Sequence, residues 1–205
     1  MKALLIKDIY TLLRQMKLFF VLVVILAVVP GFSSSGFAIV YAALMPLTAL
    51  AYDERAKWDK LAVMMPYKPE NMVVSKYLLG YISIAAACLL CLVAKYAVSV
   101  FTGTAVDSTA LFAELIAVVA VALLLMALNL PLVLKMGVEK GRMLFLVLTV
   151  AIVIAGVSYS ERYLTELTDM GRNVSQIATV MLLAALALSL ISMLFSIKLY
   201  KSKAE

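Results

Sequence analysis

Long apolar stretches alternate with short polar ones along this chain of 205 residues. A helix needs about 20 mostly apolar residues to cross the hydrocarbon core of a bilayer. No period-two alternation typical of transmembrane barrel strands is present. The pattern therefore predicts an all-α integral membrane protein, with one transmembrane domain over residues 1–205. Its six predicted spans are 18–32, 36–52, 77–101, 110–134, 144–159 and 177–197.

Composition supports the membrane class. Hydrophobic residues make up 65% of the chain and charged residues 15%, and the mean hydropathy is +1.08. Soluble domains are nearer half apolar and a quarter charged, so this chain lacks the polar residues that a water-exposed surface requires.

The basic residues are distributed unevenly between the predicted loops. Fifteen of the 18 Lys and Arg residues precede the first span, follow the last, or lie in 53–76 and 135–143. Only two lie in 160–176, and none in 31–35 or 102–109. Because cytoplasmic loops carry excess Lys and Arg, both termini are predicted to be cytoplasmic. The net charge of +6 is then a topology signal and does not indicate binding to nucleic acid.

Residues 1–17 show the pattern of an amphipathic helix. Positions 5, 9, 12, 13 and 16 are apolar, whereas Lys7, Asp8 and Arg14 fall mostly elsewhere around the helix. Such a helix is expected to lie in the membrane interface, in contact with lipid, before the first span. A plain basic flank that obeys the positive-inside rule is the alternative.

The segment 53–66 concentrates charge of both signs and contains the single tryptophan. Its spacing predicts a short cytoplasmic helix, in which Trp58, Leu61 and Met65 share an apolar stripe with residue 62. Asp53 stands four residues before Lys57, the favourable order for an ion pair within a helix. Pro66 ends this helix, and a new helix begins near residue 69 and continues into the third span.

An amphipathic cytoplasmic helix at 53–66 needs a surface to cover its apolar stripe. Lipid is one candidate, and a groove in a cytosolic partner is the other. Mixed charge favours the partner, since adhesion to lipid favours Lys and Arg without Asp and Glu. The candidate docking residues are Asp53, Glu54, Arg55, Lys57, Trp58, Asp59, Lys60, Leu61 and Met65.

Several classes of chemistry lack their usual residues in this sequence. There is no histidine, which removes Ser-His and Cys-His pairs and the commonest metal ligand. No G-x-x-x-x-G-K-[ST] motif occurs, so no ATP hydrolysis through a P-loop is expected from this chain. Cys88 and Cys91 lie in an apolar span, where small packing residues are the favoured interpretation over a metal or redox site. We therefore predict neither an enzyme nor a metal site.

Polar side chains inside spans are functional candidates by default. Lys95 lies in the third span, where it either extends toward the outer surface or faces a pathway or dimer interface. Glu114 near the start of the fourth span is predicted to lie on the same side, so a Lys95–Glu114 ion pair is a hypothesis. Asn129 is a candidate for bonding between helices, and Pro131 is expected to kink the fourth span.

The layout of the chain and one stretch of its sequence resemble a known family. The text YDERAKWDKLAVMMP, followed by ENMVVSKYLLG, is similar to a small-permease branch of the ABC-2-type permeases, the membrane subunits of bacterial ABC exporters. Membrane subunits of phenol-soluble modulin exporters belong to that branch. The resemblance covers the whole chain in layout, and its specific motif covers about residues 52–80.

The resemblance implies a transport function in the bacterial cytoplasmic membrane. Two permease chains, expected to be identical, would each bind one cytosolic ABC ATPase subunit, which holds the ATP and Mg²⁺. Segment 53–66 would be the coupling helix, and residues 160–176 an outer loop or short helix. The substrate would be amphipathic or hydrophobic: a peptide, toxin or antibiotic. A membrane scaffold or sensor that docks a partner without transporting is the alternative. Residues of the implied connecting helix are Lys7, Ile9, Leu12, Leu13 and Arg14.

Overall fold

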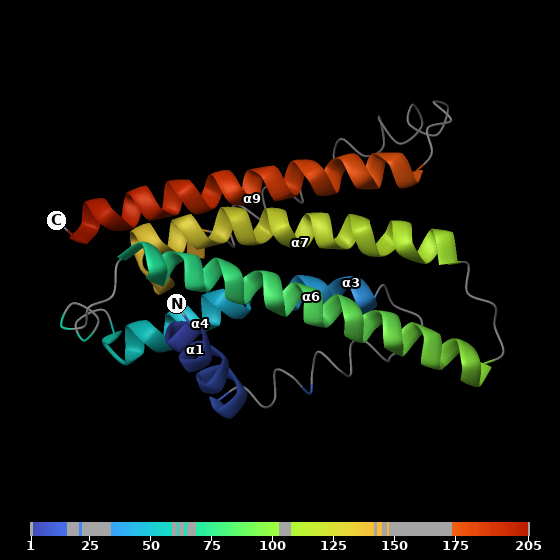
Figure 1. Ribbon diagram of the computed structural model, residues 1–205, viewed down its shortest axis with the longest axis horizontal. Coiled ribbons are helices and arrows are strands. Elements are labelled where there is room, and N and C mark those ends of the chain that lie inside the picture. The colour runs from blue at the N-terminus through green and yellow to red at the C-terminus, as the bar shows by residue number, and fades with distance from the viewer. Residues whose placement is uncertain are drawn as a thin grey trace.

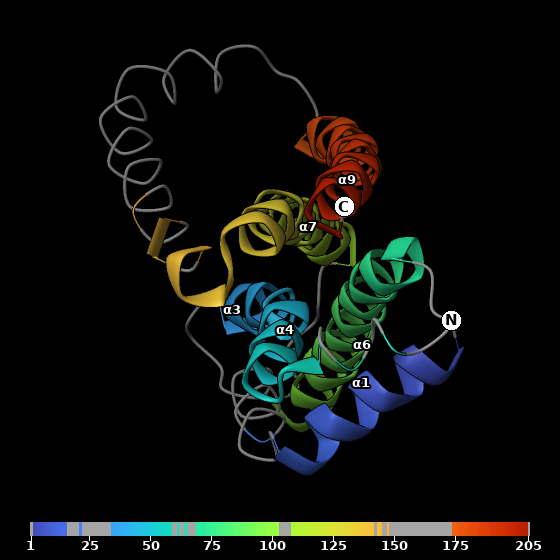
Figure 2. The ribbon, with the colours of Figure 1, turned by 90° about the vertical axis from the view of Figure 1, so that its left-hand side faces the viewer.

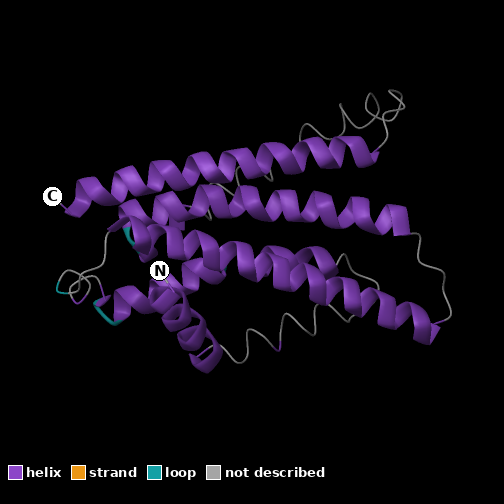
Figure 3. Cartoon of the chain, viewed as in Figure 1, coloured by secondary structure: helices purple, strands orange, loops and turns teal. Residues whose placement is uncertain are grey.

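The computed structural model describes residues 2–15, 21, 34–58, 61, 64, 69–102, 108–141, 143, 144, 147 and 174–204. Every regular element in these ranges is a helix, as the sequence predicts (Figure 3). The helices are α1 (Lys2–Gln15), α3 (Ser34–Ala42), α4 (Met45–Arg55), α6 (Pro69–Thr102), α7 (Ser108–Met136) and α9 (Val174–Ala204).

Four helical stretches are long and apolar enough to cross a membrane. They coincide with the predicted second, third, fourth and sixth spans. The predicted first and fifth spans and the outer segment 160–176 lie outside the described residues, apart from single positions and residues 174–176. The count of six spans and the orientation of the termini therefore remain predictions. The four observed stretches are Gly36–Arg55, Glu70–Val100, Glu114–Met136 and Thr179–Tyr200.

The second of the predicted spans is not one continuous helix. It consists of α3 and α4, separated by a turn at Ala43 and Leu44. Pro46 lies in the first turn of α4, where the missing N–H of proline is tolerated. Since proline cannot donate to the carbonyl four residues earlier, the helix is interrupted there.

The third span belongs to a much longer helix. α6 begins at Pro69 with Glu70 in its first turn, as the sequence predicts, and has 34 residues. At 1.5 Å per residue it is about 51 Å long, roughly 20 Å more than the hydrocarbon core of a bilayer. One end of α6 therefore extends beyond the apolar layer and carries polar side chains.

The helices pack as a bundle around α6 and α7. α7 and α9 run side by side, α3 and α4 lie on another side of α7, and α1 crosses the first half of α6 (Figure 1, Figure 2). One end of the bundle brings together α1, the beginning of α6 and the last turns of α7 and α9 (Figure 1). We call it the ring end, because a ring of charged side chains lies there.

Gly80 marks the closest approach inside the bundle. A Cβ atom at this position would overlap the Met126 sulfur of α7 and lie 3.0 Å from Cγ of Pro46 in α4. The absence of a side chain therefore lets α4 and α7 both pack directly against the backbone of α6.

Candidate functional site

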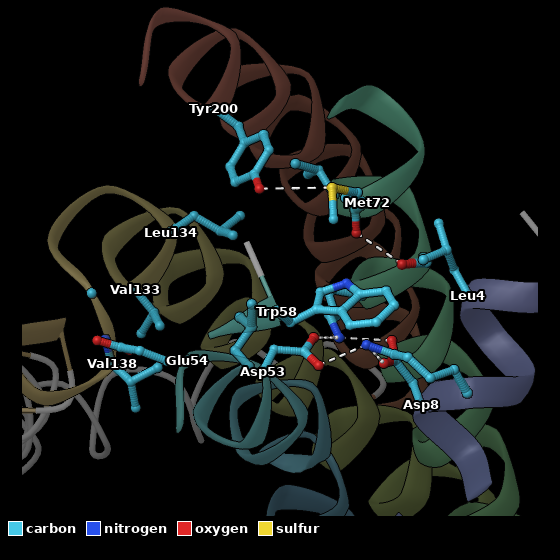
Figure 4. Close-up of a pocket in the computed structure, with 16 residues that line it drawn as sticks. Leu4, Asp8, Asp53, Glu54, Trp58, Met72, Val133, Leu134, Val138 and Tyr200 are labelled. Carbon is cyan, nitrogen blue, oxygen red and sulfur yellow. Dashed lines mark hydrogen bonds and ion pairs between the residues drawn. The ribbon is translucent and has the colours of Figure 1, made fainter. Parts of the chain in front are cut away.

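Four charged side chains from three helices form a closed ring at the ring end of the bundle (Figure 4). Lys7 Nζ of α1 lies 3.0 Å from Asp8 Oδ1 and 2.6 Å from Asp53 Oδ1 of α4. Lys76 Nζ of α6 lies 2.7 Å from Asp8 Oδ2 and 2.5 Å from Asp53 Oδ2. Each lysine thus bridges both aspartates, and we call these four residues the charged ring.

The charged ring is electrically neutral and largely shielded from solvent. The side chains of Asp8, Lys76, Asp53 and Lys7 are 2%, 7%, 14% and 26% exposed. A buried charge is costly unless an opposite charge and hydrogen bonds compensate it. Here all four carboxylate oxygens have an ammonium partner, so the charged ring links α1, α4 and α6.

The end of α4 explains why Asp53 reaches the ring. α4 ends at Arg55, and Lys57 has a φ of 52° in the left-handed region. The predicted helix over 53–66 is therefore interrupted, and Asp53 pairs with distant lysines and not with Lys57. Just beyond Lys57, the centre of the Trp58 indole ring lies 4.2 Å from Lys7 Nζ, in a cation–π contact.

Glu54, next along α4, is used for a different internal contact. Its Oε2 accepts the backbone N–H of Val138 at 2.8 Å, just beyond the end of α7. Gly137 precedes it with a φ of 84°, and its backbone turn brings that N–H to the carboxylate. Of the candidate docking residues, Asp53 and Glu54 thus bond within the chain.

The other candidate docking residues differ in their exposure. Arg55 and Lys57 are exposed, and Trp58 is half-buried. Leu61 is 48% exposed, and the neighbouring Met64 is 85% exposed. Asp59, Lys60 and Met65 lie outside the described residues.

One side of α1 packs against the bundle. Leu4, Asp8 and Leu12, spaced four residues apart, are buried. Ile9 and Leu13, predicted on the apolar stripe, are exposed, as is Arg14. Asp8 faces the bundle, where Lys7 and Lys76 compensate its charge.

A cavity of about 120 Å³ lies beside the charged ring (Figure 4). All the helices that meet there contribute to its wall, including α7 through Leu134 and α9 through Tyr200. The cavity is therefore lined both by α1 and the Trp58 segment and by the long helices of the bundle.

A family model described as an ABC-2 family transporter protein matches residues 3–201. The chain belongs to the ABC-2 transporter family. No curated protein and no solved structure matches it. The ABC-2 protein is thus a multi-pass membrane component of a transporter, and the family implies association with an ABC ATPase.

The predicted pair of intramembrane charges is present in the ABC-2 protein. Lys95 Nζ of α6 lies 2.7 Å from Glu114 Oε2 of α7, and these side chains are 30% and 43% exposed. Asn129 is buried, and its Oδ1 has no hydrogen-bond partner among the residues described. The functional roles of the three residues remain predictions.

Sequence reasoning missed a set of hydroxyl contacts in the ABC-2 protein. Tyr77 OH lies 2.8 Å from Ser192 Oγ and 2.9 Å from Ser196 Oγ, and Tyr81 OH lies 2.8 Å from Ser189 Oγ. The tyrosines are one turn apart on α6, and the serines share a face of α9 at i, i+3 and i+7. That helical spacing is the signal from which the contacts were predictable.

Proposed function

We propose that this ABC-2 protein is the transmembrane subunit of an ATP-driven exporter in the bacterial cytoplasmic membrane. Its substrate is an amphipathic or hydrophobic peptide, toxin or antibiotic. Two identical copies each bind one ABC ATPase subunit, which holds the ATP and Mg²⁺. The family match over residues 3–201 supports the transport role, and resemblance to the small-permease branch supports export and the substrate class.

The charged ring is the observation that carries the proposal. It joins α1, which corresponds to the connecting helix, to the end of α4, from which the coupling segment continues. It also joins both to α6, a helix long enough to reach from this site across the bilayer. A push on the Trp58 segment by the ATPase is therefore passed to a membrane span through ion pairs and not through a flexible loop.

Docking is tested with two matched methionine substitutions. Met64 in the coupling segment is 85% exposed, and Met143 outside it is 72% exposed. We expect Met64→Asp to weaken binding of the purified chain to the ATPase at least tenfold, since it places a charge in an apolar contact. Met143→Asp makes the same substitution at a comparably exposed methionine and should leave binding unchanged. Equal effects of the two variants would place the contact elsewhere.

Transport is tested with the reconstituted complex. Proteoliposomes that contain this chain and its ATPase are supplied with ATP, and amphipathic peptides are screened for stimulated hydrolysis and for ATP-dependent movement across the bilayer. Stimulation and vectorial movement together support an exporter. An ATPase that binds tightly, with no response to any peptide or lipid, favours the scaffold or sensor function instead.

A further inference from the structure

Two prolines in apolar helices each leave one backbone carbonyl without its helical donor. Pro46 has no N–H for the carbonyl of Ala42, four residues earlier, and Pro131 has none for that of Ala127. An unpaired carbonyl is costly inside a membrane, where water is absent. Each of these carbonyls must therefore find a donor on another helix.

A serine from a neighbouring helix supplies each donor. Ser83 Oγ of α6 donates to the Ala42 carbonyl at 2.9 Å, and Ser192 Oγ of α9 donates to the Ala127 carbonyl at 2.5 Å. Both carbonyls belong to alanines, whose small side chains allow the neighbouring helix to come close. The same arrangement thus occurs twice in the bundle, on different helix pairs.

The segments between these prolines and the ring end are joined to each other. Leu47 packs with Val133 and Val138 in a hydrophobic cluster separate from the main core. Glu54 at the end of α4 accepts the N–H of Val138. Residues 47–55 and 132–138, which we call the hinge segments, therefore contact each other through both apolar and polar groups.

We propose that Pro46 and Pro131 are paired hinges of the transport cycle, and that Ser83 and Ser192 are positioning residues that latch them in the conformation described here. The inference rests on the proposed function, because the ATPase supplies the force. Asp53 in the charged ring receives that force seven residues beyond Pro46, at the end of a rigid helical arm of about 10 Å. Both hinge segments then swing together relative to α3 and to the part of α7 before Pro131, while Asp53 stays paired with Lys76 of α6.

Each latch serine has a second hydrogen-bond partner. Ser83 Oγ also lies 2.9 Å from the Gly80 carbonyl, and Ser192 Oγ lies 2.8 Å from Tyr77 OH. When the helix bends at a proline and the freed carbonyl turns away, each serine keeps one partner, so one serine–carbonyl hydrogen bond is broken per hinge. At Gly80, α4 and α7 pack against the backbone of α6 with no side chain between them.

A double-mutant cycle tests the latches in the purified full chain. Pro131→Ala restores an N–H for the Ala127 carbonyl, which makes the Ser192 donor redundant. We expect Ser192→Ala to lower the folding equilibrium constant between about threefold and about 20-fold in the native background. In the Pro131→Ala background the loss should be clearly smaller, because only the contact with Tyr77 OH is then lost. Equal losses in both backgrounds overturn the latch.

Ser189 provides the matched control on α9. It bonds to Tyr81 and to the Leu186 carbonyl of its own helix, and it serves no carbonyl freed by proline. Ser189→Ala should cost the same in both backgrounds. Hydrogen–deuterium exchange gives a second measurement that needs no proline variant: Ser192→Ala should raise exchange near residue 131, while Ser192→Thr should not. Unchanged exchange in Ser192→Ala also overturns the latch.

The hinges are tested by transport in the ATPase complex. A variant with both Pro46→Ala and Pro131→Ala should still bind the ATPase. It should export at least tenfold less substrate for each ATP hydrolysed. If this variant transports as much substrate per ATP as the native chain, the hinge proposal is wrong. If the native chain binds no ATPase at all, the proposed function fails instead, and the double-mutant cycle still decides whether the serines are latches.

Discussion

The two lysines of the charged ring differ in burial, and that difference predicts unequal effects of the same substitution. Lys76→Met leaves Asp8 and Asp53, 2% and 14% exposed, with a single shared ammonium. Removing one partner of a buried ion pair costs about 3–5 kcal/mol. Lys7→Met removes the more exposed cation, at 26%, and leaves both carboxylates bonded to Lys76. We expect Lys7→Met to lower the free energy of unfolding by only about 1–2 kcal/mol. Solvent compensates part of the lost ion pairing, and the loss of the cation–π contact with Trp58 is included in this figure.

Thermal unfolding of the purified chain in detergent measures the difference. For a chain of this size 1 kcal/mol corresponds to about 2–4 °C in Tm. Lys76→Met should therefore lower Tm by about 6–20 °C, and Lys7→Met by only about 2–8 °C.

A double variant tests whether the ring acts as a neutral unit. Lys76→Met with Asp8→Asn removes one charge of each sign and leaves the Lys7–Asp53 pair at 2.6 Å. We expect the double variant to be more stable than Lys76→Met alone. Equal losses for the two lysine variants, or no recovery in the double variant, would refute the reasoning.

Two further predictions follow from helix contacts. Gly80→Ala should destabilise the chain by about 1–3 kcal/mol, because its Cβ meets the Met126 sulfur; the loss measured by thermal unfolding should shrink in a Met126→Ala background, and an unchanged loss would show that the overlap is not its cause. Lys95→Glu and Glu114→Lys should each destabilise by about 0.2–1 kcal/mol, the range for exposed pairs, and the double exchange should restore native Tm and transport. Independent damage by the two reversals would mean that the pair does not act as one.

Features governed by local sequence were predictable. The apolar stretches predicted the long helices of the bundle. Pro69 and Glu70 predicted where α6 begins. The Lys95–Glu114 pair was accessible to sequence reasoning because span lengths and orientation place both residues on one side.

Features decided by distant contacts were not predictable in the same way. Asp53 has a lysine four residues later, yet its partners are 46 and 23 residues away. Helical spacing cannot reveal this choice, because it depends on how α1 and α6 pack. One signal was present: Asp8 lies four residues from Leu4 and from Leu12. A charge in line with an apolar stripe indicates a partner from another helix.

The charged ring also has a consequence for the order in which the protein is made. Once Asp53 has been synthesised, Asp8 and Asp53 have only Lys7 to balance them, and the second cation of the ring arrives 23 residues after Asp53. At about 5–20 residues per second, that interval is roughly 1–5 s. During this time one of the two aspartates on α1 and α4 lacks a compensating charge. Burying it would be costly, so these helices are expected to stay in contact with water or lipid headgroups. Synthesis of α6 supplies the missing cation. The first part of the protein therefore completes its assembly only when its third predicted span has been made.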